Sequence, residues 1–171
     1  MYGLSLGWGK RLRWPDDYFT LSAELSFQRF ILKDWSYLYI RLNNGEYMNT
    51  GKSNNLSLGF TLARNSTDNP IFPRKGSDFS ASVHLTPPYS LFSDKDYATY
   101  GKNDYDEAAS VYNWIEYHKW KFKAKTFTAL STAQKCPVIM TRAEFGLLGH
   151  YNKYKKSPFE TFYMGGDGMT G

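Results

Sequence analysis

Apolar and polar residues alternate along most of this chain. In the clearest stretch, residues 18–30, Phe19, Leu21 and Phe27 share one face and Glu24 lies on the other. Successive side chains of a strand point to opposite faces, so such a stretch forms a strand with one apolar and one polar face. Applied to the whole chain, the pattern predicts six strands, over residues 2–9, 18–30, 55–64, 77–86, 108–130 and 137–150.

The fifth predicted strand, residues 108–130, is the longest and the least regular. Its first half carries apolar residues on both faces, whereas its second half places Trp120 and Phe122 opposite Lys121 and Lys123. No stretch of the chain shows the 3.6-residue period of an amphipathic helix. We therefore expect strands and loops throughout.

The connections between the predicted strands alternate in length. Short connections follow the first, third and fifth strands, and long ones follow the second, fourth and sixth, the last being residues 151–171. Outer-membrane barrels have this layout, with tight periplasmic turns and large external loops. The sequence therefore predicts an all-β fold, namely a segment of an antiparallel transmembrane β-barrel.

Residue size indicates which face of the sheet meets water. The polar face is rich in Gly and Ser and holds few charges, whereas soluble surfaces are denser in Lys and Glu. A charge that faces lipid costs roughly 2–4 kcal/mol at the bilayer midplane. The residues expected to face lipid are Phe19, Leu21, Leu25 and Phe27. The charged residues expected inside the lumen are Glu24, Lys121, Lys123, Arg142 and Glu144.

The role of these charges has two interpretations. The lysines of residues 119–125 either form a solvated wall near the periplasmic end or pair with acidic groups of an inserted loop or a passing substrate. Arg142 and Glu144 lie two positions apart on one face, so they either join an ion network in the lumen or are simply solvated.

The number of strands indicates that the barrel is incomplete. The smallest membrane barrels have eight strands, and an open edge in hydrocarbon would leave backbone groups unpaired. We therefore expect the remainder of the same barrel to pair with this arc at both edges. No secretory signal precedes Tyr2, so we expect the protein to be either cytosolic or an internal piece of a longer protein.

Composition narrows the function classes. Aromatic residues make up 18% of the chain, which fits the aromatic girdles of outer-membrane barrels but also an aromatic-rich soluble lectin. The net charge of +5 is spread along the chain without a Gly-rich loop, zinc pattern or basic helix, so no nucleic-acid partner is expected. The single Cys136 excludes an internal disulfide and a cysteine zinc site. With no carboxylate pair, triad or metal-ligand spacing, we expect neither an enzyme nor a cofactor.

Two segments carry a resemblance to a known family. Residues 68–76 resemble the periplasmic turn of the outer-membrane protein-assembly superfamily, and the turn residues are Asn69, Pro70, Pro73 and Gly76. Residues 157–166 are similar to the start of that family's long sixth external loop, which folds back into the lumen. By this resemblance the lumen-folding residues are Pro158, Phe159, Phe162, Tyr163, Gly165 and Gly166. Residues 117–120 also look like the strand in between.

The resemblance is strongest to the BamA-like branch of this superfamily, and it covers most of the chain. It implies an integral protein of the Gram-negative outer membrane, with these six strands taken from a sixteen-stranded barrel. It also implies a role in folding and inserting other β-barrel proteins. The implied partners are nascent outer-membrane proteins, accessory outer-membrane lipoproteins and membrane lipid. The family's periplasmic POTRA domains are absent here, and we expect its Arg-Gly loop motif to follow Gly171.

Other functions remain compatible with the same alternation. A passive porin or transporter barrel would show it, and so would a sister protein of the superfamily that acts in secretion. A soluble carbohydrate-binding β-protein is the third alternative.

Overall fold

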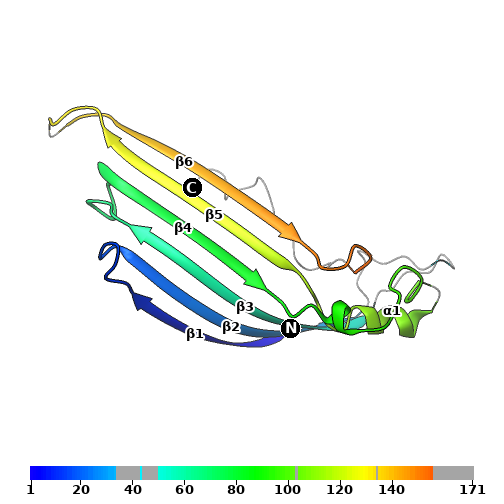
Figure 1. Cartoon of the computed structure of the whole chain (residues 1–171). Coiled ribbons are helices and arrows are strands. Elements are labelled where there is room, and N and C mark those ends of the chain that lie inside the picture. The colour runs from blue at the N-terminus through cyan, green and yellow to red at the C-terminus, as the bar shows by residue number, and fades with distance from the viewer. Residues whose placement is uncertain (34–42, 44–49, 103, 134, 156–171) are drawn as a thin grey trace.

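The computed structural model describes residues 1–33, 43, 50–102, 104–133 and 135–155, without the side chains of Leu32 and Tyr105. These residues form one antiparallel sheet of six strands that neighbour each other in chain order. The strands are β1 (Tyr2–Arg11), β2 (Phe19–Leu32), β3 (Gly51–Asn65), β4 (Lys75–Leu85), β5 (His118–Ala129) and β6 (Val138–Gly149). The sheet is twisted and open, with β1 and β6 at its two edges (Figure 1). The predicted all-β, antiparallel fold is confirmed.

The prediction of a strand over residues 108–130 is wrong for its first half. Residues 108–130 do not form a single strand, because α1 (Tyr105–Val111) and a loop occupy the first part and β5 begins only at His118. The expectation of no helix fails here, and also at the short 3-10 helix η1 (Tyr89–Phe92). The apolar residues on both faces of 108–117 are the physical reason. They pack into a small core, which a two-faced strand in a membrane wall cannot do.

The two ends of the sheet differ in the length of their connections. The three short connections lie together at one end, here called the short-turn end, and the long ones lie at the opposite loop end (Figure 1). Antiparallel strands in chain order require this arrangement, since each connection reverses the chain direction. Within the described part of the chain, neither helix has the length and apolar character needed to cross a membrane.

The segment of residues 86–117, called the cap, closes a free strand edge at the loop end. The pairing of β3 with β4 stops at Leu58 and Leu85, so the first residues of β3 lack β4 as a partner. The cap supplies one instead. The amide of Asn54 donates to the carbonyl of Asn113 at 2.8 Å, and the amide of Ile115 donates to the carbonyl of Asn54 at 2.9 Å. An unpaired edge is thereby covered.

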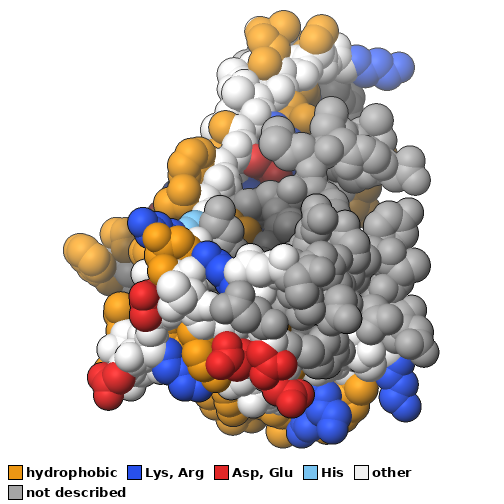
Figure 2. Space-filling model, turned by 90° about the vertical axis from the view of Figure 1, so that its right-hand side faces the viewer, with side chains coloured by type: hydrophobic (Ala, Val, Ile, Leu, Met, Phe, Trp, Pro, Cys, Tyr) orange, Lys and Arg blue, Asp and Glu red, His pale blue; other side chains and the backbone are white. Residues whose placement is uncertain are grey.

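The cap also holds the buried apolar core. Among the described residues, the buried apolar side chains are Tyr97, Ala108, Val111, Ile115 and Tyr117, all within the cap. Gly101 is required beside this core, because its φ is +80° and a Cβ there would collide with Val111. Figure 2 views this end of the molecule, where acidic side chains gather on the surface. The cap thus resembles a small water-soluble unit attached to the wall.

Candidate functional site

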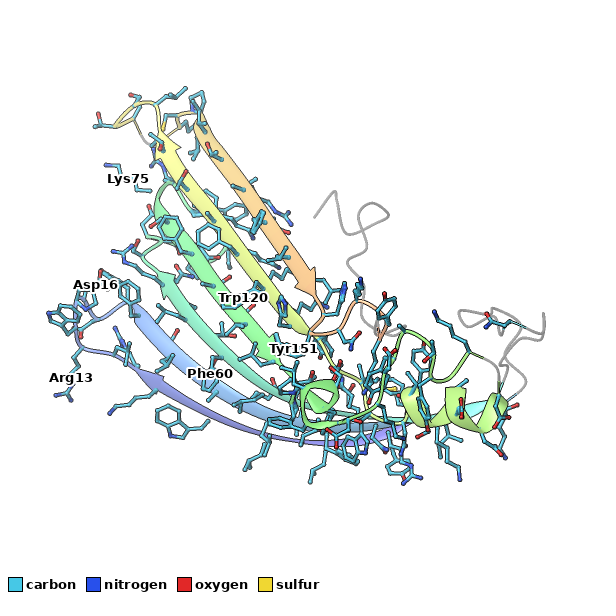
Figure 3. The ribbon with its side chains drawn as sticks, turned by 45° about the vertical axis from the view of Figure 1, so that its right-hand side comes forward. Arg13, Asp16, Phe60, Lys75, Trp120 and Tyr151 are labelled. Carbon is cyan, nitrogen blue, oxygen red and sulfur yellow. The ribbon has the colours of Figure 1, made fainter. Side chains whose placement is uncertain are left out.

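The first functional surface is the apolar face of the sheet. Cross-strand register aligns its residues into continuous rows. One row holds Trp8, Ala23, Phe60, Val83, Trp120 and Leu147. The next holds Leu21, Leu62, Ala81, Phe122 and Phe145, with Lys10 at its β1 edge. In Figure 3, Phe60 and Trp120 project from neighbouring parts of this wall. A water-soluble protein rarely exposes a contiguous apolar face of this extent.

Burial along β3 is inverted relative to that of a soluble sheet. Ser57 and Gly59 are buried, whereas Leu58 and Phe60 are both 40% exposed and Leu62 is 41% exposed. β5 repeats the inversion, because Trp120 and Phe122 are exposed while the intervening lysines are half-buried. On β3 and β5 the polar face is therefore the more sheltered one, whereas on β2 the polar residues Ser22 and Glu24 are exposed. The apolar face must be covered by something other than this sheet, and lipid fits the rows that are apolar from β2 to β6.

Two arginines mark the limits of the apolar face. Arg29 lies on the same face at the loop end, and Arg64, opposite Phe19, lies on it at the short-turn end. From Arg29 to Phe19, β2 advances ten residues. At about 3.4 Å per residue and a strand tilt of about 40°, this length spans about 26 Å of depth. Outer-membrane barrels carry an apolar band about 25 Å tall, so on β2 and β3 the two arginines bound a band of the required height. On β1, Lys10 lies within this height.

The polar face forms the second surface. A recess of about 350 Å³ crosses β2 to β5 at the loop end. The polar side chains that line it include Glu24, Gln28, Asn55, His84, Lys119 and Lys121. The floor is close-packed at Gly59, where a Cβ would meet the His84 ring at 2.9 Å. The recess combines cations with amide and hydroxyl groups, so it suits a polar or acidic polypeptide segment.

The predicted lumen charges all lie on this polar face, in two groups. Glu24 and Lys121 line the recess. The second group lies nearer the short-turn end, where a nitrogen of Arg142 is 2.7 Å from Glu144 Oε1 and Lys123 Nζ is 3.9 Å from the same oxygen. Arg142 therefore pairs with Glu144 on the polar face, with Lys123 nearby, and the position of this pair in a lumen stays a prediction. These side chains are about one-third exposed, so solvent screens the attraction between their charges and the pair contributes little to stability.

The predicted turn of Asn69, Pro70, Pro73 and Gly76 is built from side-chain hydrogen bonds. Asn69 Oδ1 accepts the amides of Ile71 and Phe72 at 2.9 and 3.2 Å. Asp68 Oδ1 accepts the amides of Arg74 and Lys75, and these two donors hold the pKa of Asp68 below its usual range. Gly76 has a φ of +107° and lies against the Ser66 backbone, so no other residue fits there.

Two arginines that the sequence did not single out tie the short turns together. The Arg64 guanidinium contacts Asp16 at 2.8 Å and donates to the hydroxyls of Ser66 and Ser77. Arg74 donates to the Ala133 carbonyl and, at 2.9 Å, to the sulfur of Cys136, which lowers the pKa of Cys136. Figure 3 shows Asp16 and Lys75 at this end, opposite Tyr151. Strand alternation contains no signal for these contacts between turns.

A buried ion pair in the cap was also missed. Glu116 is 1% exposed and Lys155 is 5% exposed, and Lys155 Nζ lies 3.7 Å from Glu116 Oε2. The same carboxylate oxygen accepts the Ser90 amide at 2.8 Å. Burial lowers the pKa of Lys155, although Glu116 opposes the shift. The pair joins the cap to the segment after β6, and only the tertiary fold brings its members together.

The predicted lumen-folding residues cannot be located in this structure. Pro158, Phe159, Phe162, Tyr163, Gly165 and Gly166 all lie outside the described residues. Their role stays a prediction.

Comparison of the sequence with known proteins identifies the family of this chain. A search among curated proteins found no match. The family model described as the Omp85 superfamily domain matches residues 1–170. Proteins of this superfamily are outer-membrane proteins of Gram-negative bacteria and of organelles, and they assemble or transport other proteins without being enzymes. A six-stranded wall with an outward apolar face agrees with that family. We conclude that this chain belongs to the Omp85 superfamily.

Proposed function

We propose that this chain forms one arc of a BamA-like barrel in the outer membrane of a Gram-negative bacterium. The complete barrel would fold and insert other β-barrel proteins. Membership of the Omp85 superfamily supports an assembly or secretion role over that of a passive porin. It also counts against a soluble carbohydrate-binding protein.

The observation that carries the membrane part of the proposal is the inverted burial of β3. Its small polar residues are buried and its large apolar residues are exposed. In water this arrangement would be unfavourable, because a Leu or Phe that stays 40% exposed forgoes part of the about 1.5–3 kcal/mol that full burial provides. In a bilayer the same residues meet lipid, and the band between Arg29 and Arg64 has the height of the hydrocarbon layer.

The wall would contribute to insertion without covalent chemistry. The outer edges of β1 and β6 have no partner strand among the described residues, so the remainder of the barrel would pair with them. A barrel of this kind lowers the barrier to insertion by offering strand edges and a polar interior to incoming chains. The polar recess and the lysines of β5 would line that interior. Accessory lipoproteins would act from outside this arc.

Depletion of the full-length protein tests the proposal. If it acts as an assembly protein, most β-barrel proteins of the outer membrane decrease together after its expression is shut off. A sister secretion transporter would instead leave those barrels unchanged and stop the export of one secreted substrate. A passive pore would change only solute uptake. Either of the last two results would overturn the proposed assembly function.

A further inference from the structure

A groove of about 390 Å³ lies over β4 on the apolar face of the sheet. The small residues Ala81 and Val83 of β4 form its floor, and larger side chains of the two neighbouring strands rise on both sides. Figure 3 shows two of these larger side chains projecting from the strands that flank β4. By register, the residues that form the sides are Phe60 and Leu62 of β3 and Trp120 and Phe122 of β5.

The width of this depression, called the β4 groove, suits a single hydrocarbon chain. Its two sides come from β3 and β5, which are two strand spacings apart, about 10 Å. Carbon atoms in contact lie about 4 Å from each other, so a chain between two sides needs about 8 Å. The β4 groove therefore has room for one chain and not for two.

The side chains that line the β4 groove offer no free hydrogen-bonding group among the described residues. Ser82 and Lys121 border the groove, but their side chains point to the polar face and their main chains pair with each other in the ladder. Trp120 Nε1 donates to His118 Nδ1 at 3.1 Å. A polypeptide would leave backbone amides and carbonyls unpaired here, which is costly away from water. A hydrocarbon chain has no such groups.

The depth of the β4 groove assigns it to one leaflet of the proposed membrane. On β3, Leu62 and Phe60 precede Arg64 by two and four residues. At about 3.4 Å per residue and a tilt of about 40°, they lie about 5 and 10 Å from the end of the apolar face. Half of a band about 25 Å tall is about 12 Å. The groove therefore lies in the leaflet at the short-turn end. Lys10, the charged residue in the row of Leu62, is on β1 and does not line it.

We propose that the β4 groove is a binding site for one acyl chain of a phospholipid from this leaflet. In the groove the chain contacts protein at the floor and on both sides, whereas elsewhere on the apolar face it contacts protein on one side only. Each additional contact adds dispersion attraction, so the chain in the groove exchanges with the surrounding lipid more slowly than other chains do. This inference rests on the proposed membrane position of the wall.

A photoreactive lipid tests the site on the full-length protein. The protein is reconstituted into vesicles of phosphatidylethanolamine and phosphatidylglycerol that contain a phosphatidylglycerol with a diazirine midway along one acyl chain. After illumination, mass spectrometry of peptides locates the lipid adducts. We expect at least about threefold more adduct at Leu62 and Val83 than at Trp8 and Leu147, which share the row of Val83 but lie outside the groove. Equal adduct at all four positions would mean bulk lipid only and overturn the inference.

Two variants change the β4 groove in opposite ways. Ala81→Phe fills its floor and Phe122→Ala removes part of one side, so each should lower the adduct at Leu62 at least about threefold. Ala124→Phe is the matched control, because it adds the same side chain to the apolar face outside the groove, and it should leave the adduct unchanged. Heat-modified migration on gels verifies that each variant is folded. An adduct at Leu62 that persists in either folded groove variant would overturn the inference.

A second crosslink tests for other occupants in native outer membranes. Phe145 lies at the rim of the groove and is 63% exposed, so p-benzoylphenylalanine in its place reacts with whatever fills the groove. We expect adducts with the mass of one phospholipid. An adduct with another polypeptide, or with a second copy of this chain, would mean a protein interface and overturn the inference.

These failures are distinguishable from failure of the proposed function. If lipid adducts form evenly over the apolar face, the wall is in the membrane and only the acyl-chain site is wrong. If no residue of the apolar face forms a lipid adduct, the membrane position of the wall is wrong, and the proposed function fails with it.

Discussion

The wall of six strands and the cap obey opposite rules of burial. Phe60 and Leu62 of the wall face outward, while the polar Ser57 is buried. In the cap, Val111 and Ile115 are buried, as in a protein folded in water. One chain therefore contains regions made for two solvents, and the boundary between them lies near Arg29 at the loop end.

The contrast follows from what surrounds each region. In the proposed membrane position, lipid would give no reward for hiding an apolar side chain, and the wall would be stabilised by its ladder of backbone hydrogen bonds. Water rewards burial by about 25 cal/mol per Å² of apolar surface, so the cap folds around its own core. Substitutions should therefore have effects that depend on the region in which they are made.

The largest effect is expected in the cap, from Lys155→Met. This change leaves the Glu116 carboxylate buried without its counter-ion, which costs about 3–5 kcal/mol. The cap should open locally while the wall stays folded. Hydrogen exchange of the Ser90 and Ile115 amides in the full-length protein measures the opening.

The double variant Glu116→Gln/Lys155→Met is the matched control for the buried pair. It removes both charges, so most of the protection from exchange should return. Equal opening in the single and double variants would show that Lys155 acts by packing and not by charge.

The next effect belongs to the wall, where Phe60→Arg places a charge near the middle of the apolar band. We expect a loss of about 2–4 kcal/mol in the free energy of unfolding from lipid vesicles. The neighbouring Thr61→Arg points to the polar face and should cost far less. Denaturant titration of both variants makes the comparison, and a larger loss for Thr61→Arg would reverse the assignment of the two faces.

A smaller effect is expected at the short-turn end, from Gly76→Ala. The φ of +107° and the adjacent Ser66 backbone leave no room for a Cβ, and such strain costs about 1–3 kcal/mol. Gly7→Ala is the control, because no atom lies within 4 Å of its Cβ position. Heat-modified migration of both variants on gels measures the difference, and equal stability would argue against a strained turn.

The smallest effect is a pH dependence confined to the short turns. Amides of Arg74 and Lys75 that donate to Asp68 lower the pKa of Asp68. A carboxyl whose pKa is lower in the folded state stabilises that state above its unfolded pKa of about 3.9 and loses this contribution as the pH falls. The amide shift of Lys75 should thus titrate with a midpoint below about 3.9. Asp68→Asn should abolish this transition and leave the cap unchanged.

Sequence patterns located five of the six strands to within a few residues. β2 and β4 follow the predicted ranges closely, while β3 begins at Gly51 and not at residue 55. That extension could not be predicted, because its partner on one side is the cap residue Trp114 and not a neighbouring strand. The fifth strand failed for a related reason, since Ala108 and Val111 serve a core that only the folded loop creates.

The contacts of the candidate site were also only partly predictable from the sequence. Alternation predicted that Glu24 and Lys121 share the polar face and that Arg142 can reach Glu144. It contained no information about Arg64 with Asp16, Arg74 with Cys136, or Glu116 with Lys155. The members of these pairs lie at least 39 residues apart in the sequence, and no periodic pattern links positions so distant.

The sequence by itself determined the strands, their two faces and the alternation of short and long connections. These properties are local, since they follow from the two-residue period of a strand and from turn residues such as Gly76. The tertiary structure alone decided that the polar residues of β3 and β5 are sheltered, that the short turns are braced against one another and that the cap holds a core. Burial and contacts between distant residues exist only once the strands are in register, so the sequence alone could not predict them.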